Sequence, residues 1–283
     1  MKHIAILITC FNRKEKTLRC IERIYANKGI NEQYNAEIYV VDGGSNDGTP
    51  IEIKNRFPKV KLTIGNGLYW AGGMRKAWNE AVLSKQDFDM FLLLNDDTDI
   101  YDDCILELLK ADEYSKKKYG KRGIYIGSTK DYLTDSVSYG GNTIKDGRLT
   151  PNGKYQECTM GNANIMMVSY ECYQNLGHLC DKYTHGLADY DYTLRAVENN
   201  IPVIITPTYC GTCSNDHSHP WLSQKHSLKE RIKFLYSPKG LAYKERLYFN
   251  KRFFPKQYVF LWFKLWLKTF FPIIWDCYKK QEK

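Results

Sequence analysis

Both of the glycine-rich loops that most often hold nucleotide phosphates are missing from this sequence. The turn after the first apolar run reads TCFNRKEK and contains no glycine, whereas a dinucleotide-binding turn needs glycines so that its backbone can approach a pyrophosphate. The sequence has no GxxxxGKS or GxxxxGKT loop either. If the chain binds a nucleotide, a metal ion held by carboxylates is the obvious substitute for these loops.

The marks of a secreted protein are also missing. The apolar run in MKHIAILITC is short and leads straight into charged residues, so we expect no signal peptide and a chain that begins in the cytosol. Nine cysteines, an odd number, are scattered along the chain, which argues against a disulfide framework. Reduced thiols are the favoured interpretation, and a zinc site built from Cys210 and Cys213 with His217 and His219 is the alternative.

Positive charge is concentrated at the C-terminal end. The formal net charge is +9, and the segment 224–283 holds 15 Lys and Arg against 4 Asp and Glu. This segment therefore carries +11, and the residues before it carry −2. A nucleic-acid partner usually needs a basic face on the folded body, so we expect none. A basic, aromatic tail is typical of segments that bind anionic lipid.

Strand and helix patterns alternate along the first 120 residues. Apolar runs predict strands at His3–Thr9, Glu37–Val41, Lys61–Ile64 and Asp89–Leu94. Amphipathic patterns predict helices at Lys14–Asn27, Thr49–Phe57, Gly73–Leu83 and Asp102–Lys118. This alternation predicts an α/β fold with a mostly parallel sheet. Between Gly123 and Met160, short β-rich pieces separated by Gly, Asp and Asn predict an insertion of irregular strands.

The fourth predicted strand ends in adjacent acids, in the stretch LLLNDDTDI. In parallel sheets the ligand lies beyond the carboxyl ends of the strands, where TCFNR, VDGGSNDG and NDDTD would converge. Asn95, Asp96, Asp97 and Asp99 supply the oxygen ligands that Mg²⁺ or Mn²⁺ prefers. The alternative is an acidic start to the next helix, with solvent screening the charges.

Five segments occur in the order and spacing of family 2 glycosyltransferases, which the chain resembles over about residues 3–220. These are ILITCFNR, YVVDGGSNDGT, GNGLYWAGGMRKAWNEA, FLLLNDDT and HGLADYDYTLRA. The family consists of inverting enzymes with the Rossmann-like nucleotide-sugar-binding fold called GT-A. The resemblance implies a GT-A catalytic domain at 1–223, followed by a basic, aromatic helical extension at 224–283.

The resemblance also implies a set of donor-binding residues. The turn after the first strand would wrap the base and ribose, and the acid after the second would hydrogen-bond the pyrimidine. The glycine-rich WAGGMR stretch would lie beside the donor sugar, with its arginine as a pyrophosphate partner or else a surface cation. The residues so implied are Thr9, Phe11, Arg13, Asp42, Gly72, Gly73, Arg75, Asp96 and Asp191.

The metal ligands and the catalytic base follow from the same resemblance. Asn95-Asp96-Asp97 stands where the family has its DxD motif, which makes Asp97 the best metal ligand. A histidine after the last motif often binds metal or pyrophosphate in relatives, and the candidates are His217 or, alternatively, His219.

Asp189 matches the second acid of the family's ED motif, the catalytic base. Ala188 replaces the first acid, and Asp191 is the alternative base. Without the resemblance, both acids could simply cap a helix.

The expected reaction is metal-dependent transfer of a sugar from a UDP- or dTDP-sugar to a hydroxyl of a lipid-linked or growing surface glycan. One catalytic carboxylate is enough because direct displacement inverts the anomeric centre, whereas a glycoside hydrolase needs two. The alternative is a non-catalytic nucleotide-sugar or glycan-binding relative, which Ala188 keeps open. A nucleotidyltransferase would carry a glycine-rich basic loop after the first strand, and that loop is absent.

The segment QYVFLWFKLWLKTFFPIIW, Gln257–Trp275, is too apolar for a solvated helix. It is also a poor membrane span, because Lys264 and Lys268 lie in its middle and Pro272 interrupts it. It predicts a helix in the membrane interface, on the cytoplasmic face of the inner membrane, with its lysines reaching the headgroups. Docking onto the protein body and true spanning are the alternatives.

Overall fold

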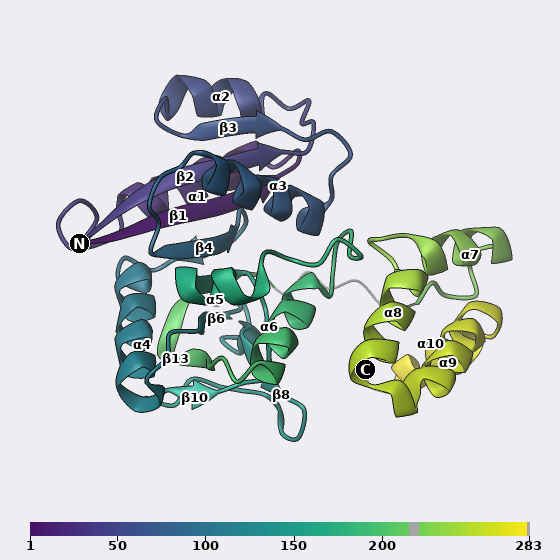
Figure 1. Ribbon diagram of the computed structural model, residues 1–283. Helices are drawn as coiled ribbons and strands as arrows, with labels where there is room; N and C mark the ends of the chain where they lie inside the picture. Colours follow the sequence, from purple (N-terminus) through teal and green to yellow (C-terminus); the bar gives the residue numbers. More distant parts are fainter. Residues whose placement is uncertain (215–220, 282–283) are drawn as a thin grey trace. The chain divides into compact units, whose positions relative to one another are not determined.

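The chain divides into two units in the computed structural model, which describes residues 1–214 and 221–281, the last four by their backbone alone (Figure 1). The first unit consists of residues 1–180 and 189–214, and the second of residues 181–188 and 221–281. No helix among the described residues combines the length and apolar content that a membrane crossing requires.

A twisted sheet forms the centre of the first unit. Its strands, in spatial order, are β10 (Gln156–Glu157), β13 (Val203–Thr212), β6 (Ile124–Lys130), β12 (Ile165–Ser169), β4 (Met90–Asn95), β1 (Lys2–Cys10), β2 (Tyr34–Asp42) and β3 (Lys61–Ile64). β3, β2, β1 and β4 are parallel, and β12 runs antiparallel between β4 and β6. β5 (Asp99–Ile100) and β7 (Val137–Tyr139) add to β13 and β6. The predicted α/β fold with a mostly parallel sheet is confirmed.

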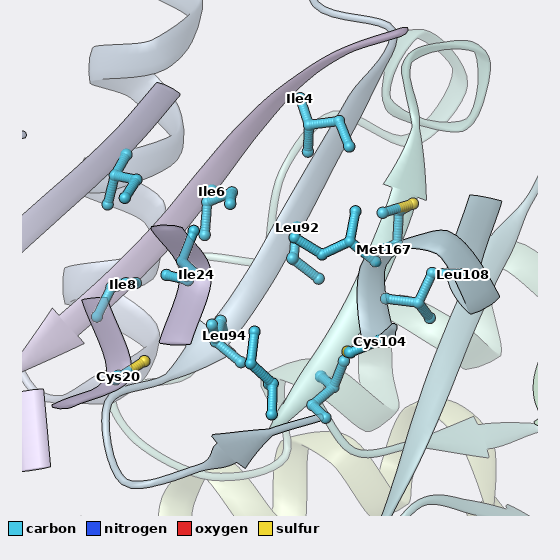
Figure 2. Close-up of a cluster of buried hydrophobic side chains, with 14 of the residues drawn as sticks. Ile4, Ile6, Ile8, Cys20, Ile24, Leu92, Leu94, Cys104, Leu108 and Met167 are labelled. Carbon is cyan, nitrogen blue, oxygen red and sulfur yellow. The ribbon is translucent and has the colours of Figure 1, made fainter. Parts of the chain in front are cut away.

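Helices cover both faces of this sheet. They are α1 (Lys14–Tyr25), α2 (Thr49–Arg56), α3 (Trp70–Leu83), α4 (Cys104–Tyr119), α5 (Tyr170–Leu176) and α6 (Ala188–Glu198). On one face, Ile4, Ile6 and Ile8 of β1 pack with side chains of α1 and α4, including Ile24 and Leu108 (Figure 2). The alternate residues of β1 face α3 and are equally buried. Burial on both faces explains the unbroken apolar run in the sequence.

The segment between Gly123 and Met160 was expected to be an insertion of irregular strands. That expectation is wrong for β6, which is a central strand of the main sheet. A Cβ on Gly127 would lie 2.8 Å from Ile165 Cγ2 and 2.9 Å from Cys210 Cβ, so the glycine lets side chains of the flanking strands close over it. The sequence showed this stretch as a β-rich piece but did not show that it lies within the central sheet. The rest of the segment is irregular, with a small separate sheet of β8 (Gly141–Thr143), β9 (Gly147–Arg148) and β11 (Met160–Gly161).

Helix α3 begins at Trp70, three residues before the predicted start. Glycine is a poor helix former, but the structure shows why position 73 has one. A Cβ at this position would lie 2.2 Å from Thr9 Oγ1. Gly73 therefore sets how closely α3 approaches β1.

The second unit is a small helical cluster of α7 (Leu228–Tyr236), α8 (Tyr243–Phe253), the 3₁₀ turn η1 (Pro255–Gln257), α9 (Tyr258–Phe270) and α10 (Ile273–Gln281). Its core consists of Leu235, Leu241, Leu247 and Leu265. The apolar segment predicted as one helix is divided at Phe271 and Pro272. Proline donates no backbone hydrogen bond and disfavours a helical residue before it, which accounts for the break.

We predict that Gly73→Ala lowers the free energy of unfolding by about 1–3 kcal/mol, the usual cost of overpacking. The matched control is Gly72→Ala in the same helix turn, where the shortest contact of a new Cβ is 3.2 Å, to the Leu68 side chain. Alanine favours helix over glycine, so Gly72→Ala should leave stability unchanged or raise it. Urea unfolding of both variants tests this, and equal effects would contradict the assignment of Gly73.

Candidate active site

The turns after β1, β2 and β4 meet at one edge of the sheet. The strand register places Cys10 beside Asp42, and Thr9 beside Asn95. Two hydrogen bonds then join the first turn to the second: Asn12 N donates to Ser45 Oγ (2.8 Å), and Asn46 N donates to Asn12 Oδ1 (2.8 Å). The predicted convergence of these turns is therefore present in the fold.

Asp42 is fully buried, and its carboxylate holds the second turn in shape. Oδ1 accepts from the backbone N–H groups of Gly44 (2.9 Å) and Ser45 (2.7 Å), and Oδ2 accepts from Ser45 Oγ (2.6 Å). These bonds occupy both carboxylate oxygens. Asp42 thus positions the loop, and its expected contact with a pyrimidine stays a prediction. Phe11, on the neighbouring turn, is 48% exposed and offers an open aromatic ring at the same edge.

Asp96 and Asp97, which we call the acidic turn, follow β4 and share one cation. Arg13 Nη2 lies 2.7 Å from Asp96 Oδ1, and Arg13 Nη1 donates to Asp97 Oδ2. Thr17 Oγ1 donates to Asp96 Oδ2 (3.0 Å). Burial raises the pKa of Asp96 to about 7, although Arg13 opposes the shift. Burial alone would lower the pKa of Arg13, but the two carboxylates raise it, so the guanidinium stays charged.

The acidic turn suits a divalent cation. Asp97 Oδ1 and Thr98 Oγ1 are buried and have no hydrogen-bond partner among the described residues. A cavity of about 130 Å³ borders them, also lined by Lys16, Arg19 and Tyr132. The described residues include no group of three His, Cys, Asp or Glu side chains suited to a metal. A cation here would thus depend on one or two carboxylates, with a diphosphate and water completing its coordination, as Mg²⁺ commonly does.

The two histidines proposed for this site, His217 and His219, lie outside the described residues. Cys210 and Cys213 are both buried. The Cys210 thiol is 3.3 Å from Thr206 Oγ1, and Cys213 Sγ accepts from Asn164 Nδ2 at 3.6 Å. These contacts fit the favoured interpretation of reduced thiols packed near a strand end.

Trp70 is a site residue that our sequence reasoning missed. Its indole Nε1 donates to Asn95 Oδ1 (2.7 Å), so the first residue of α3 is tied to the end of β4. A tryptophan immediately before AGG was the available signal. Arg75, one helical turn further on, donates from Nη1 to the carbonyl of Cys180 (2.9 Å). Its guanidinium therefore anchors the segment before residue 181, and its predicted pyrophosphate contact stays a prediction.

Asp189 lies in the first turn of α6 and is partly buried. Its carboxylate accepts from the backbone N–H of Tyr190 (2.9 Å) and of Ala163 (3.3 Å). Burial raises the pKa of Asp189, against the opposing effect of these hydrogen bonds. A partly exposed carboxylate with a raised pKa and no salt bridge to a described residue has the properties of a general base.

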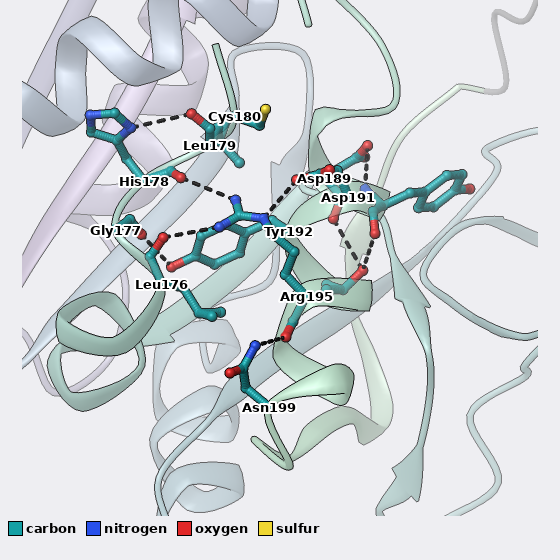
Figure 3. Close-up of polar contacts among 12 residues, drawn as sticks. Leu176, Gly177, His178, Leu179, Cys180, Asp189, Asp191, Tyr192, Arg195 and Asn199 are labelled. Carbon is teal, nitrogen blue, oxygen red and sulfur yellow. Dashed lines mark hydrogen bonds and ion pairs between the residues drawn. The ribbon is translucent and has the colours of Figure 1, made fainter. Parts of the chain in front are cut away.

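Asp191, the alternative base, is fully buried in an ion pair. Its Oδ2 accepts from Arg195 Nε (2.7 Å), one helical turn along α6. Arg195 also donates to the carbonyls of Leu176 (2.9 Å) and His178 (3.2 Å), which joins α6 to the end of α5 (Figure 3). This network gives Asp191 a structural role, so the geometry favours Asp189 as the base.

Two hydrogen bonds through neighbouring residues connect Asp189 to Asn95, the last residue of β4, which precedes the acidic turn. Asn95 N donates to the carbonyl of Asn164 (3.0 Å), and the N–H of the preceding residue, Ala163, donates to Asp189. Both residues lie just before β12, which runs antiparallel to β4 and so begins where β4 ends. The candidate base and the candidate metal ligand therefore lie at the same edge of one sheet.

Comparison with known proteins agrees with this arrangement. The sequence profile of glycosyl transferase family 2 matches residues 5–173, more than half of the 283 residues. The chain belongs to this family. The matched region contains the acidic turn and ends before Asp189. Comparison with curated proteins gives no match.

Solved structures give the family fold. The mannosyltransferase PcManGT from Pyrobaculum calidifontis, in complex with GDP-Man and Mn²⁺, is 13% identical, with a TM-score of 0.53 over 82% of this chain and 60% of that one. TarS 1-349 from S. aureus, in complex with UDP-GlcNAc, is 14% identical, with a TM-score of 0.53 over 77% of this chain and 60% of that one. The likeness establishes the GT-A fold. The chain spans about 60% of the length of these two structures.

We predict that Asp191→Asn lowers the free energy of unfolding by about 3 kcal/mol, because it leaves the buried Arg195 charge without its counterion. Asp189→Asn is the matched control in the same helix turn, since the Asp189 carboxylate accepts backbone hydrogen bonds from Tyr190 and Ala163 and forms no salt bridge with a described residue. Its effect should stay below about 1 kcal/mol. Thermal unfolding separates the two, and a larger loss for Asp189→Asn would reverse their roles.

Proposed function

We propose that this chain is a metal-dependent, inverting glycosyltransferase that moves a sugar from a UDP- or dTDP-sugar to an acceptor hydroxyl. The observation that carries the proposal is the placement of Asp97 and Asp189 at one sheet edge, where Ala163 and Asn164 connect Asp189 to Asn95, two residues before Asp97. Family membership and the GT-A fold support it. A structure of the same fold was solved with GDP-Man and Mn²⁺, which supports a nucleotide-sugar donor and a divalent cation.

Each residue has a distinct part in the proposed reaction. Asp97, with Asp96, would hold Mg²⁺ or Mn²⁺, which stabilises the negative charge of the departing nucleoside diphosphate when bound. Asp189 takes the proton of the acceptor hydroxyl while the oxygen of that hydroxyl attacks the anomeric carbon. The turn from Thr9 to Arg13, together with Gly72 and Gly73, forms the donor side of the site.

The alternative is that the chain binds a nucleotide sugar or glycan with the same fold but does not catalyse sugar transfer. Ala188 motivated it, because the family's ED motif has an acid at that position. In this structure the Ala188 side chain is fully buried, whereas Asp189 keeps partial exposure and a raised pKa. These features favour the enzyme.

The reaction is tested by two variants with different expected effects. Asp97→Ala should lose both turnover and the Mn²⁺-dependent part of UDP binding. Asp189→Asn should keep UDP and Mn²⁺ binding but lose about 10²–10⁴-fold in turnover, the usual contribution of a general base. Donor hydrolysis and calorimetric UDP titration measure the two effects.

The pH profile provides a further check on the base. Only the deprotonated carboxylate can accept a proton, so the raised pKa of Asp189 should move the rising limb of kcat/KM above the pH at which an ordinary aspartate titrates. Full turnover by Asp189→Asn would exclude this role, and the absence of donor hydrolysis by the wild type with either cation would favour the binding protein.

We also propose that the second unit binds an anionic membrane surface and that the acceptor is lipid-linked. Helix α9 packs one side on α7 and α8, through buried Leu265 and Thr269 and a hydrogen bond from Trp266 Nε1 to Tyr243 OH (3.1 Å). Its other side and the start of α10 expose what we call the aromatic face: Val259, Phe260, Phe263, Phe270, Phe271, Ile273 and Ile274.

Exposed apolar clusters of this kind mark interaction sites. The partner's chemistry is indicated by exposed cations near the aromatic face in the sequence, at Lys251, Arg252, Lys256 and Lys264. Apolar side chains together with cations suit anionic lipid better than a second protein. Lys268 differs from the expectation, because it lies between the rings of Trp221 (5.7 Å) and Trp275 (5.6 Å), where burial lowers its pKa.

We predict that the full chain sediments with phosphatidylglycerol vesicles, less with phosphatidylcholine, and less at high salt. The double variant Phe260→Ser with Phe263→Ser should reduce the bound fraction at least tenfold. Each substitution removes roughly 2 kcal/mol of the free energy gained when the apolar side chain is buried in the membrane. The matched control is Leu83→Ser with Leu133→Ser, which removes exposed apolar side chains of the first unit and should bind as the wild type does. Equal loss in both double variants, or none, would refute the proposal.

A further inference from the structure

A single guanidinium serves both carboxylates of the acidic turn. Arg13 Nη2 lies 2.7 Å from Asp96 Oδ1, and Nη1 donates to Asp97 Oδ2. Asp99, two residues further on, is paired instead with Arg19 and Arg23. Within the described part of the chain, Arg13 is therefore the only cation in a salt bridge with Asp96 or Asp97.

We propose that Arg13 takes the place of the divalent cation in the free protein and weakens the binding of that cation. When a nucleoside diphosphate binds, Arg13 moves away and the cation can bind. The inference rests on the proposed function and adds a coupling to it. The cation and the nucleotide each bind more tightly when the other is present than when it is absent. Arg13 is a positioning residue in this scheme, since it acts through the acidic turn.

The acidic turn needs a cation in the free protein because its two carboxylates are close together and poorly screened by solvent. Asp96 is only 1% exposed, so solvent screens its repulsion with Asp97 poorly. Arg13 offsets that repulsion and fixes both carboxylates, while Asp97 Oδ1 is buried and has no hydrogen-bond partner in the part of the chain that the structure describes. The two carboxylates are thus held in position for a ligand, and Arg13 already balances one of their two negative charges.

The exchange follows from the position of Arg13. A divalent cation on Asp97 would lie within a few ångströms of the guanidinium, and two cations so close repel each other. The Arg13 side chain is 40% exposed, so it can move outward into solvent. A nucleoside diphosphate would give the guanidinium a new anionic partner, which removes the repulsion.

The inference predicts linked binding. Diphosphate should raise Mn²⁺ affinity in the wild type, and Mn²⁺ should raise diphosphate affinity by the same factor. Arg13→Gln should bind Mn²⁺ alone at least about fivefold more tightly, because a unit charge at about 4 Å is worth that factor even in water. The enhancement by UDP should shrink accordingly.

Mn²⁺ binding is measured by the loss of the free-ion electron paramagnetic resonance signal, with and without UDP. Arg13→Lys keeps the charge and should resemble the wild type. Arg56→Gln removes the same charge from an exposed pair with Glu22 and should leave Mn²⁺ affinity unchanged. Circular dichroism confirms that each variant is folded.

The outcomes separate this inference from the proposed function. Unchanged or weaker Mn²⁺ binding by Arg13→Gln, while the wild type binds Mn²⁺ and UDP together, would overturn the exchange alone. Absence of Mn²⁺ binding by the wild type in the presence of UDP would overturn both the metal role of Asp97 and the exchange.

Discussion

The candidate site depends on the pairing of β1 with β2 on one side and with β4 on the other. Because these pairs are parallel and in fixed register, Cys10, Asp42 and Asn95 end at the same level. A slip of one residue in either pair would exchange the side chains of β1 that face α1 and α4 with those that face α3, and the close packing on both faces opposes this. The hydrophobic core therefore determines where the polar turns meet.

Much of this arrangement could be predicted from the sequence. Buried parallel strands are continuous apolar runs, so β1, β2 and β4 and the polar turns that follow them were visible. What could not be predicted depends on contacts between distant segments. The indole of Trp70 on Asn95, and the closure of side chains over Gly127, appear only when the chain is folded.

The two acids of α6 show the same limit. Asp189 and Asp191 lie two residues apart, and residue type alone gave both the same chemistry. The structure separates them because Arg195 reaches Asp191 and also the carbonyls at the end of α5, while Asp189 accepts backbone N–H groups and forms no salt bridge with a described residue. A base must be able to exchange a proton with the acceptor. A buried counterion for arginine cannot do so without a large loss of stability.

The close approach of α3 to β1 has an evolutionary consequence. The space between the two elements is shared by the side chain at position 9 and whatever stands at position 73. In relatives with this packing, a larger residue at position 73 should therefore occur with a smaller one at position 9. Because α3 also carries Trp70, such paired changes would be a route by which the edge of the candidate site shifts while the core stays filled.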